Sequence, residues 1–461
     1  MRQRSRSVVR IAGAALMTAV LAATGIAQEP AAAAAHPAMA HIQAYIETFN
    51  AGVPGQMKTY FLTHVADQAL KEIPVDQRLT RFRGAKAQLK SLEIERVVSD
   101  EPSTAAVLTK AASGQYVLIR ATAEKTGAYK LLSLALELVD DPANIVVPQP
   151  KANEADLVAA IREFLEAQTK ADQFSGVVLV AKGPQVIFHE AYGLADRDKQ
   201  IPNRKDTKFN LGSINKNFTR AAIHQLARQG KLTLDATIKT YLPDYPNAAA
   251  AEKVTIRQLL NMTSGIGDFF GERYDATPKE KIRSLKDYLP LFADQPLEFE
   301  PGTSNKYSNG GYIVLGLIIE KVSGVDYYTY VREHIFKPCG MTDTDAYPRD
   351  AKTPNLAHGY TLPKGGGPRV LNFDTLPGRG SSAGGGYSTA ADMLKYVLAL
   401  NDRKIYLPDV ADGLGIAGGA QGINSVLEWD PRSGFTVIVL TNLDPPTAGD
   451  AARKIASWLP K

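Results

Sequence analysis

The sequence predicts an α+β protein in which a small helix-plus-sheet domain precedes a larger domain with an antiparallel sheet, flanking helices and a helical subdomain. Three observations predict this arrangement. The chain has 461 residues, which is more than one ordinary domain holds. A Pro-rich stretch at residues 146–150 separates two regions of different pattern. The second region carries strand-like runs at both of its ends and helical patterns between them.

The N-terminus has the pattern of a secretory signal peptide, which we place at residues 1–28. Four arginines precede an apolar run from Ile11 to Ala23, and small residues follow at the expected cleavage positions. An uncleaved membrane anchor is the less favoured alternative, because the run is shorter than the ~20 residues that a membrane span needs. An Ala/Pro-rich linker is expected at residues 29–37. These features predict a periplasmic or secreted protein without a stable membrane span after cleavage.

Composition argues against several classes of function. Apolar residues make up 44% of the chain and charged residues 22%, which is typical of a soluble globular protein. The formal net charge is +5, and removal of the four N-terminal arginines leaves +1, so no nucleic-acid-binding surface is expected. The single cysteine, Cys339, has hydrophobic neighbours and is expected in the core. With one Cys and seven His, neither a metal-ligand cluster nor a cofactor is predicted, and the oligomeric state stays open.

The region at residues 38–147 is predicted to form the small domain. Apolar residues from Met39 to Phe49 follow helical spacing, Gly52 can end that helix, and a second helix is expected around Phe82. Strand-like runs follow at Leu92–Val98, Ala106–Leu108, Tyr116–Ile119 and Leu132–Leu136. This order of elements resembles the NTF2-like fold, in which helices pack on one face of an antiparallel sheet.

A linker is predicted at residues 148–154, and the larger domain at residues 155–461. A helix from Glu154 to Thr169 opens this part of the chain. Strands are expected at Phe174–Ala181, Val186–His189, Ser425–Trp429 and Phe435–Leu440, with a closing helix that runs to Leu459. Strands at both ends with a helical middle predict one sheet built from both ends of the domain.

A serine and a lysine at helical spacing are the first candidate catalytic residues. Ser213 lies at the start of a predicted helix, where unpaired N–H groups and the helix dipole favour a developing alkoxide. Lys216 falls on the same helical face three residues later. Burial can lower the pKa of a lysine enough for it to take a proton from a hydroxyl nucleophile. This spacing alone is weak support, because Ser213 could cap the helix and Lys216 could be solvated.

The segment Tyr307-Ser308-Asn309 is the second candidate motif. A Tyr near a lysine can act as a general base, and Asn309 can hold a substrate carbonyl and contact the lysine. Tyr245-Pro246-Asn247 has the same spacing but lies in a Pro/Asp-rich turn, and we interpret it as structural.

Taken together, these segments resemble the serine β-lactamase-like and penicillin-binding-protein family, which includes class C β-lactamases, D-alanyl-D-alanine carboxypeptidases and related esterases. Other segments that fit the family in the right order are Leu232–Asp235, Leu259–Gly265, Phe299–Gly302 and Gly384–Asp392. The resemblance covers about residues 155–461. It implies the β-lactamase/transpeptidase-like fold, Ser213 as nucleophile, Lys216 and Tyr307 as its general base, and Asn309 as a substrate-binding residue.

The third motif of the family, Lys or His before Thr/Gly-Gly, should fall near residues 415–420, and this chain departs from it. The basic position is expected at Ile416, whereas Gly418 and Gly419 are present. The resemblance implies that a backbone N–H near Gly419 pairs with that of Ser213 as an oxyanion hole. Loss of the cation predicts a preference for uncharged substrates, although Lys306 or Arg379 could substitute.

The sequence therefore predicts a serine hydrolase that forms an acyl-enzyme on small-molecule or peptide esters or amides, as a peptidase, an esterase or a weak β-lactamase. Gly380–Gly384 matches the G-x-S-x-G nucleophile elbow, but no histidine follows Ser382 as that mechanism requires. The remaining alternative is a non-catalytic β-lactam- or peptidoglycan-binding member of the same fold. The retention of Ser213, Lys216, Tyr307 and Asn309 together favours the enzyme.

Overall fold

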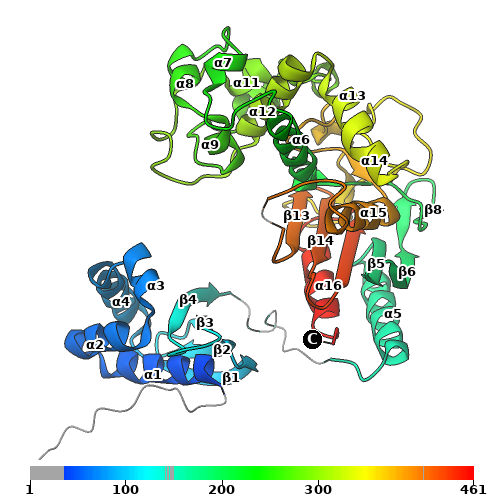
Figure 1. Ribbon diagram of the computed structural model, residues 1–461. Coiled ribbons are helices and arrows are strands. Elements are labelled where there is room, and N and C mark those ends of the chain that lie inside the picture. Colours follow the sequence, from blue (N-terminus) through cyan, green and yellow to red (C-terminus); the bar gives the residue numbers. More distant parts are fainter. Residues whose placement is uncertain (1–35, 141, 143–144, 146–149, 409, 461) are drawn as a thin grey trace, which may run out of the picture. The chain divides into compact units, whose positions relative to one another are not determined.

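The computed structural model describes residues 36–140, 142, 145, 150–408 and 410–460 (Figure 1). The chain divides into two compact units, residues 1–145 and residues 146–461. The predicted signal peptide lies outside the described residues, as does the predicted linker at 29–37 except for its last two residues. Within the described ranges, every helix is too short or too polar to span a bilayer.

Helices come before strands in the first unit. Its elements are α1 (Pro37–Ala51), α2 (Pro54–His64), α3 (Asp67–Glu72), α4 (Val75–Leu89), β1 (Leu92–Glu101), β2 (Thr104–Ala111), β3 (Tyr116–Ala123) and β4 (Leu131–Val139). The strands form an antiparallel sheet in sequence order. Helix α1 ends at Gly52, whose φ of 70° is left-handed, and Ile42 and Phe49 are fully buried. The order of elements agrees with the sequence pattern, and the NTF2-like fold stays a prediction.

The short helices α2 and α3 do not follow from the sequence pattern. Helix α2 buries only Met57, Tyr60 and Phe61, so its apolar stripe is too sparse to stand out. Its position is fixed by aromatic packing, since the Tyr60 ring lies 5.6 Å from that of Tyr45 on α1.

The sheet of the second unit joins both ends of that part of the chain. Its strands are β5 (Gly176–Lys182), β6 (Gln185–Tyr192), β13 (Leu414–Ala420), β14 (Ile423–Trp429) and β15 (Phe435–Thr441). The order is β13-β14-β15-β5-β6, and every neighbouring pair is antiparallel. Strand β15 is buried along its whole length between β14 and β5, which explains its unbroken apolar run. The prediction of one sheet built from both ends is confirmed.

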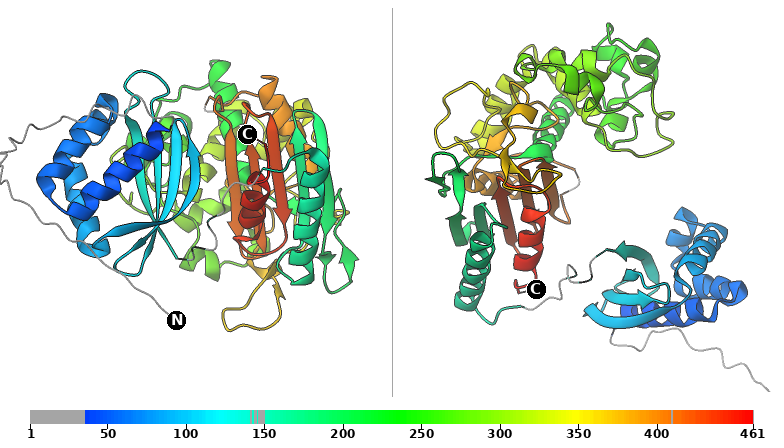
Figure 2. Two further views of the ribbon diagram at one scale, coloured as in Figure 1. Left: turned by 90° about the horizontal axis from the view of Figure 1, so that it is seen from below. Right: turned by 180° about the vertical axis from the view of Figure 1, so that it is seen from behind.

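Helices cover both faces of this sheet (Figures 1 and 2). Helices α5 (Glu154–Lys170) and α16 (Thr447–Ala456) pack on one face, where Leu157, Ile161 and Leu165 of α5 are buried at helical spacing. Burial of each such side chain stabilises the fold by roughly 1.5–3 kcal/mol. Helices α6 (Lys216–Arg228) and α15 (Ala390–Asn401) contribute to the hydrophobic core of the other face.

A helical subdomain fills the middle of the chain. It contains α7 (Ile238–Tyr241), α8 (Ala248–Lys253), α9 (Ile256–Leu260), α10 (Glu272–Ala276), α11 (Leu289–Phe292), α12 (Asn309–Ser323), α13 (Tyr327–Val331) and α14 (Lys337–Cys339). Helix α12 is buried on all sides from Asn309 to Ile319, so it lies inside the subdomain.

The second unit also contains short two-stranded ribbons. They are β7 (Leu194–Asp196) with β8 (Ile201–Pro202), β9 (Phe209–Asn210) with β12 (Tyr387–Ser388), and β10 (Tyr360–Thr361) with β11 (Val370–Leu371). In the β9–β12 ribbon Tyr387 pairs with Asn210. Because Ser213 follows β9 and three glycines precede β12, this pairing brings residues 384–386 beside the nucleophile candidate.

Candidate active site

Ser213 lies in a 3-10 turn (Gly212–Asn215) that continues directly into α6. The turn is fixed from both sides: the Gly212 N–H donates to Asn210 Oδ1 over 2.9 Å, and the Leu211 N–H donates to the Gly386 carbonyl over 2.8 Å. Gly212 has a φ of 51°, a conformation that favours glycine. The hydroxyl therefore stands at a rigid helix start, as the sequence predicts.

Lys216 is the first residue of α6 and is only 5% exposed. Its ammonium nitrogen donates to Ser213 Oγ at 3.1 Å, Asn309 Oδ1 at 2.7 Å and the Ala383 carbonyl at 2.5 Å. Burial lowers its pKa to about 7, and the opposing effect of the Asp268 charge is smaller. A large fraction of the Lys216 amine is therefore neutral near pH 7 and able to accept a proton.

Tyr307 approaches Ser213 from the other side. Its hydroxyl shares a short hydrogen bond with Ser213 Oγ, and its ring centre lies 4.7 Å from the Lys216 nitrogen. Burial raises the pKa of the Tyr307 phenol, an effect that the hydrogen bond to Ser213 only partly offsets. Burial therefore favours the protonated phenol, and of the two base candidates only Lys216 has its pKa shifted toward neutrality.

Asn309, the first residue of α12, links the lysine to a carboxylate that the sequence did not indicate. Its side-chain Nδ2 donates to Asp268 Oδ2 at 2.7 Å, so its oxygen points to Lys216. Asp268 lies in the loop after α9 and has no fixed spacing to Ser213, so no pattern in the sequence singles it out. Ser308 caps α12 by accepting the Gly311 N–H at 2.9 Å, which sets the helix start that presents Asn309.

Strand β13 passes so close to the Ser213 turn that only glycine fits at residue 418 of the strand and at residue 212 of the turn. A Cβ on Gly418 would lie 2.0 Å from the Leu211 carbonyl oxygen and 2.8 Å from the Ser213 nitrogen. A Cβ on Gly212 would lie 2.9 Å from the Gly419 nitrogen. The structure thus places both predicted glycines against the backbone of the nucleophile.

The assignment of the family's basic position to Ile416 stays a prediction, and neither Ile416 nor its neighbour Ala417 carries a cation. Side chains alternate along a strand, and Ile416 packs against the core under the sheet. Ala417, Gly418, Gly419 and Ala420 line the cleft. The two possible substitutes do not line it: Lys306 pairs with Glu298 at 2.8 Å, and Arg379 Nε donates to the Ala346 carbonyl at 2.7 Å.

A cleft of about 510 Å³ opens over the nucleophile. Five of the six predicted site residues line it, namely Ser213, Tyr307, Asn309, Gly418 and Gly419, while Lys216 lies beneath. The remaining wall is mostly apolar and is formed by Phe269, Phe270, Tyr274, Tyr288, Pro377, Ala383, Ala417, Ala420 and Pro445. No Lys or Arg is among the described residues that line this cleft.

Three residues to which the sequence analysis gave no catalytic role, Ser382, Asn247 and Cys339, are buried or cap a helix. Ser382 of the elbow-like motif is fully buried and donates to the Tyr312 carbonyl at 2.8 Å. Asn247 caps α8 by accepting the Ala250 N–H. Cys339 is buried, and burial raises the pKa of its thiol to about 12. Among the described residues, no group of His, Cys, Asp or Glu is arranged to hold a metal ion.

A family profile described as Beta-lactamase matches residues 158–412, which is more than half of the chain. The chain belongs to the β-lactamase family. The resemblance inferred from the sequence motifs is thereby confirmed, as is the β-lactamase/transpeptidase-like fold.

The chain is similar to penicillin-binding proteins and to an esterase. The putative penicillin-binding protein PbpX of Bacillus subtilis is 34% identical over 50% of this chain and 56% of its own length. Esterase EstB of Burkholderia gladioli is 29% identical over 64% of this chain and 82% of its own. The crystal structure of a penicillin-binding protein from Bacillus halodurans matches with a TM-score of 0.58 and 31% identity, over 64% of this chain and 99% of that one. The chain spans about half the length of the Bacillus subtilis relatives it matches. The enzyme class predicted from the sequence agrees with this family.

The fit between β13 and the Ser213 turn can be tested with two alanine substitutions on one strand. Gly418→Ala should displace β13 or the turn, because the added Cβ overlaps the Leu211 carbonyl. We expect a loss of stability of roughly 1–3 kcal/mol in denaturant unfolding, with slower labelling of Ser213 by a fluorophosphonate. Gly415→Ala is the matched control, since nothing lies within 4 Å of its Cβ position. Equal effects of the two substitutions would contradict the close approach.

Proposed function

We propose that this protein hydrolyses uncharged esters or amides with an apolar acyl group, through an acyl-enzyme on Ser213. The observation that carries the proposal is the buried Lys216, whose pKa is about 7 and whose amine lies 3.1 Å from the Ser213 hydroxyl. A weak hydroxyl nucleophile needs such a base to react. The relationship to an esterase, EstB, supports the same chemistry.

In the proposed acylation step, neutral Lys216 accepts the Ser213 proton while Oγ attacks the substrate carbonyl carbon. The negative charge that develops on the carbonyl oxygen faces the backbone N–H groups of Ser213 and the glycine strand. Tyr307, hydrogen-bonded to Ser213 Oγ, passes its proton to the leaving oxygen or nitrogen, and protonated Lys216 then reprotonates the resulting phenolate. Water then attacks the acyl-enzyme by the same proton transfers in reverse.

The cleft wall supports the choice of substrate. Phe269, Phe270 and Tyr274 offer apolar surface to an acyl group, and Phe270 is 56% exposed at the mouth. A substrate carboxylate would lose water there without gaining a cation, because no Lys or Arg is among the described residues that line the cleft. Peptidases and β-lactamases that bind a substrate carboxylate are therefore less well matched than an esterase or amidase.

Other parts of the proposal rest on the sequence. We expect export through the N-terminal signal and a first unit that takes no part in catalysis. The rival function is a non-catalytic β-lactam- or peptidoglycan-binding protein. In that case Ser213 would complete no hydrolysis cycle.

The acyl-enzyme is tested directly by mass spectrometry. Brief reaction with an activated p-nitrophenyl ester should add one acyl group to the intact protein, at the peptide that contains Ser213. Ser213→Ala should abolish the adduct and reduce ester hydrolysis to the background rate. Stable labelling without turnover would support the non-catalytic binder, and an adduct that persists in Ser213→Ala would refute the assignment.

The rate of hydrolysis should rise with pH through neutrality. Lys216 is active when deprotonated, and its pKa is about 7, so the protonated and inactive form dominates at lower pH. We expect kcat/KM to fall about tenfold per pH unit well below that pKa and to level off above it. The measurement is a pH profile of ester hydrolysis in buffers of constant ionic strength. A profile that is flat across pH 7 would show that Lys216 is not the base.

Substrate preference should depend on the side chain at residue 417 and not on that at residue 416. The wild type is expected to favour p-nitrophenyl butyrate over nitrocefin, which carries a carboxylate. Ala417→His should shift the ratio of kcat/KM values toward nitrocefin by about tenfold, the effect of roughly 1.4 kcal/mol. Ile416→His is the control, because residue 416 packs against the core and not in the cleft. Efficient nitrocefin hydrolysis by the wild type would contradict the proposed preference.

A further inference from the structure

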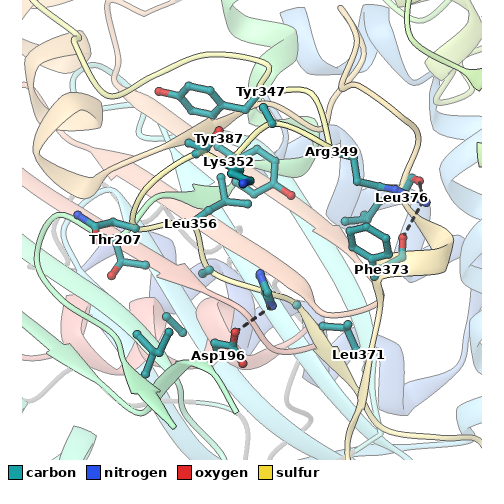
Figure 3. A pocket seen from close by; sticks show the side chains of 18 of the residues that line it. Asp196, Thr207, Tyr347, Arg349, Lys352, Leu356, Leu371, Phe373, Leu376 and Tyr387 are labelled. Carbon is teal, nitrogen blue, oxygen red and sulfur yellow. Dashed lines mark hydrogen bonds and ion pairs between the residues drawn. The ribbon is translucent and has the colours of Figure 1, made fainter. Parts of the chain in front are cut away.

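A second cavity of about 460 Å³ lies in the second unit, outside the cleft described above (Figure 3). Its walls come from residues 195–207, from residues 347–359 and from residues 371–376, with Tyr387 of β12 completing them. None of these residues lines the cleft over Ser213. The proposed hydrolysis therefore leaves this cavity without a role.

Apolar side chains gather at the cavity although they are open to solvent. Ile201 is 46% exposed, Leu371 40% and Phe373 40%, and Tyr347 adds a further ring. Exposed apolar groups that cluster in a concave site are typical of a ligand-binding surface. The lining favours an apolar group.

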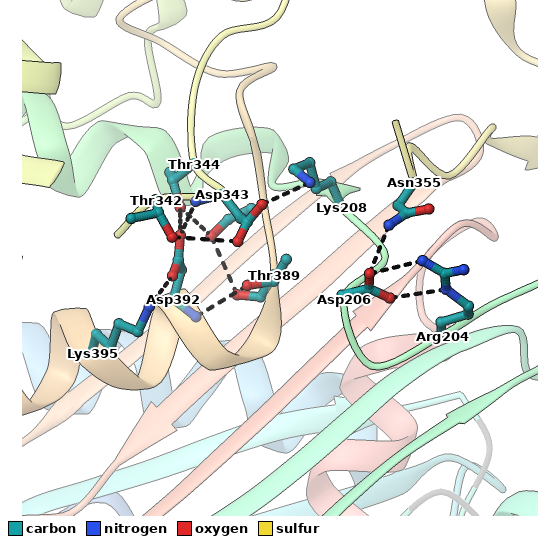
Figure 4. A network of polar contacts seen from close by, with 11 residues as sticks. Arg204, Asp206, Lys208, Thr342, Asp343, Thr344, Asn355, Thr389, Asp392 and Lys395 are labelled. Carbon is teal, nitrogen blue, oxygen red and sulfur yellow. Dashed lines mark hydrogen bonds and ion pairs between the residues drawn. The ribbon is translucent and has the colours of Figure 1, made fainter. Parts of the chain in front are cut away.

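The charged side chains that line the cavity are mostly cationic: Lys199, Arg204, Arg349 and Lys352, against the single carboxylate of Asp196. Two of these cations are already neutralised. Lys199 pairs with Asp196 at 3.2 Å, and Arg204 binds both oxygens of Asp206, which also accepts from Asn355 (Figure 4).

The other two cations form no ion pair with the described residues, although Asp350, which pairs with Arg283, is near enough for its charge to act on Arg349. Lys352 forms no ion pair or hydrogen bond with the described residues. Among the described residues, the Arg349 guanidinium donates only to the carbonyls of Phe373 and Leu376, at 3.2 and 3.1 Å, and it lies 4.0 Å from the Phe373 ring centre. A guanidinium held on an aromatic ring and an ammonium on the wall of the same cavity offer two cations to an anion.

We propose that this cavity is a second ligand site, which binds a small aromatic carboxylate. The carboxylate would lie between Lys352 and Arg349, and its ring would pack against Phe373, Leu371 and Ile201. The proposal does not depend on the hydrolytic activity.

The site has a short connection to the nucleophile. The Tyr387 hydroxyl is hydrogen-bonded to the Asn210 side chain, and Asn210 Oδ1 accepts the N–H of Gly212, the residue before Ser213. The far end of β12 is held by a buried network in which Ser388 bonds to Thr344 and Thr344 to Asp392 (Figure 4). A ligand that packs on Tyr387 therefore acts on a rigid ribbon that also fixes the Ser213 turn. We expect an occupied cavity to change the reactivity of Ser213.

The binding test uses 2-naphthoate as the probe and 2-naphthalenemethanol as its uncharged match, titrated calorimetrically into the full chain. Naphthoate should bind more tightly than the alcohol, with an affinity that falls as salt is added. Lys352→Glu should raise the Kd for naphthoate by at least about tenfold, because it places a like charge at the site. Lys321→Glu, on the exposed side of α12, is the matched charge control and should leave the Kd unchanged.

A second pair of variants separates this cavity from the cleft. Ala351→Trp fills the second cavity at an exposed wall residue, and Ala420→Trp fills the cleft in the same way. Loss of naphthoate binding in Ala351→Trp with retention in Ala420→Trp supports the proposal. The reverse result, or a Kd that is unchanged in Lys352→Glu, would overturn it.

The effect of an occupied second cavity on Ser213 is measured separately, by the rate at which Ser213 is labelled. Labelling of Ser213 by a fluorophosphonate should change its rate at saturating naphthoate in the wild type and in Lys321→Glu, but not in Ala351→Trp. An unchanged rate in the wild type at saturation would refute the connection, whereas the calorimetric result would still decide whether the site exists.

Discussion

An amine buried beside a hydroxyl is the constraint around which the second unit is organised. Lys216 is 5% exposed, and its described acceptors are a hydroxyl, an amide oxygen and a backbone carbonyl, all of them neutral. A permanent charge there would lose most of its hydration without a carboxylate partner, which is costly. Asn309 holds Asp268 one side chain away, so the carboxylate moderates the fall in the Lys216 pKa without forming an ion pair with it.

The geometry around that amine depends on elements that are distant in the sequence. Ser213 and Lys216 come from the start of α6, Asn309 from the start of α12, and Ala383 from the loop before β12. Helix α12 can present Asn309 because Gly310 lets it pack closely: a Cβ there would lie 2.4 Å from the Gly267 carbonyl. The burial of α12 on all sides makes this arrangement stiff, which suits a site that must hold a proton acceptor in place.

Charge is distributed unevenly between the two cavities of the second unit. The cleft over Ser213 is lined by aromatic rings and no described cation, whereas the second cavity carries two cations, Arg349 and Lys352, that form no ion pair with the described residues. The two are separated by the β9–β12 ribbon, with Gly384 and Gly385 on the cleft side and Tyr387 at the other cavity. An apolar site strengthens hydrogen bonds to a developing oxyanion, while a cationic site selects anions, so a ligand suited to one is poorly suited to the other.

The sequence by itself determined the sheet built from both chain ends, the family, and the group of Ser213, Lys216, Tyr307 and Asn309. Apolar periodicity and short ordered segments encode these features locally. The tertiary structure decided what depends on which groups meet in space. It showed that Asp268 lies behind Asn309, that burial lowers the pKa of Lys216 to about 7 while it raises that of Tyr307, and that Ala417 and not Ile416 lines the cleft. Burial, the facing of a strand and contacts between remote loops arise only when the chain is packed, so no spacing of residues along the sequence could supply them.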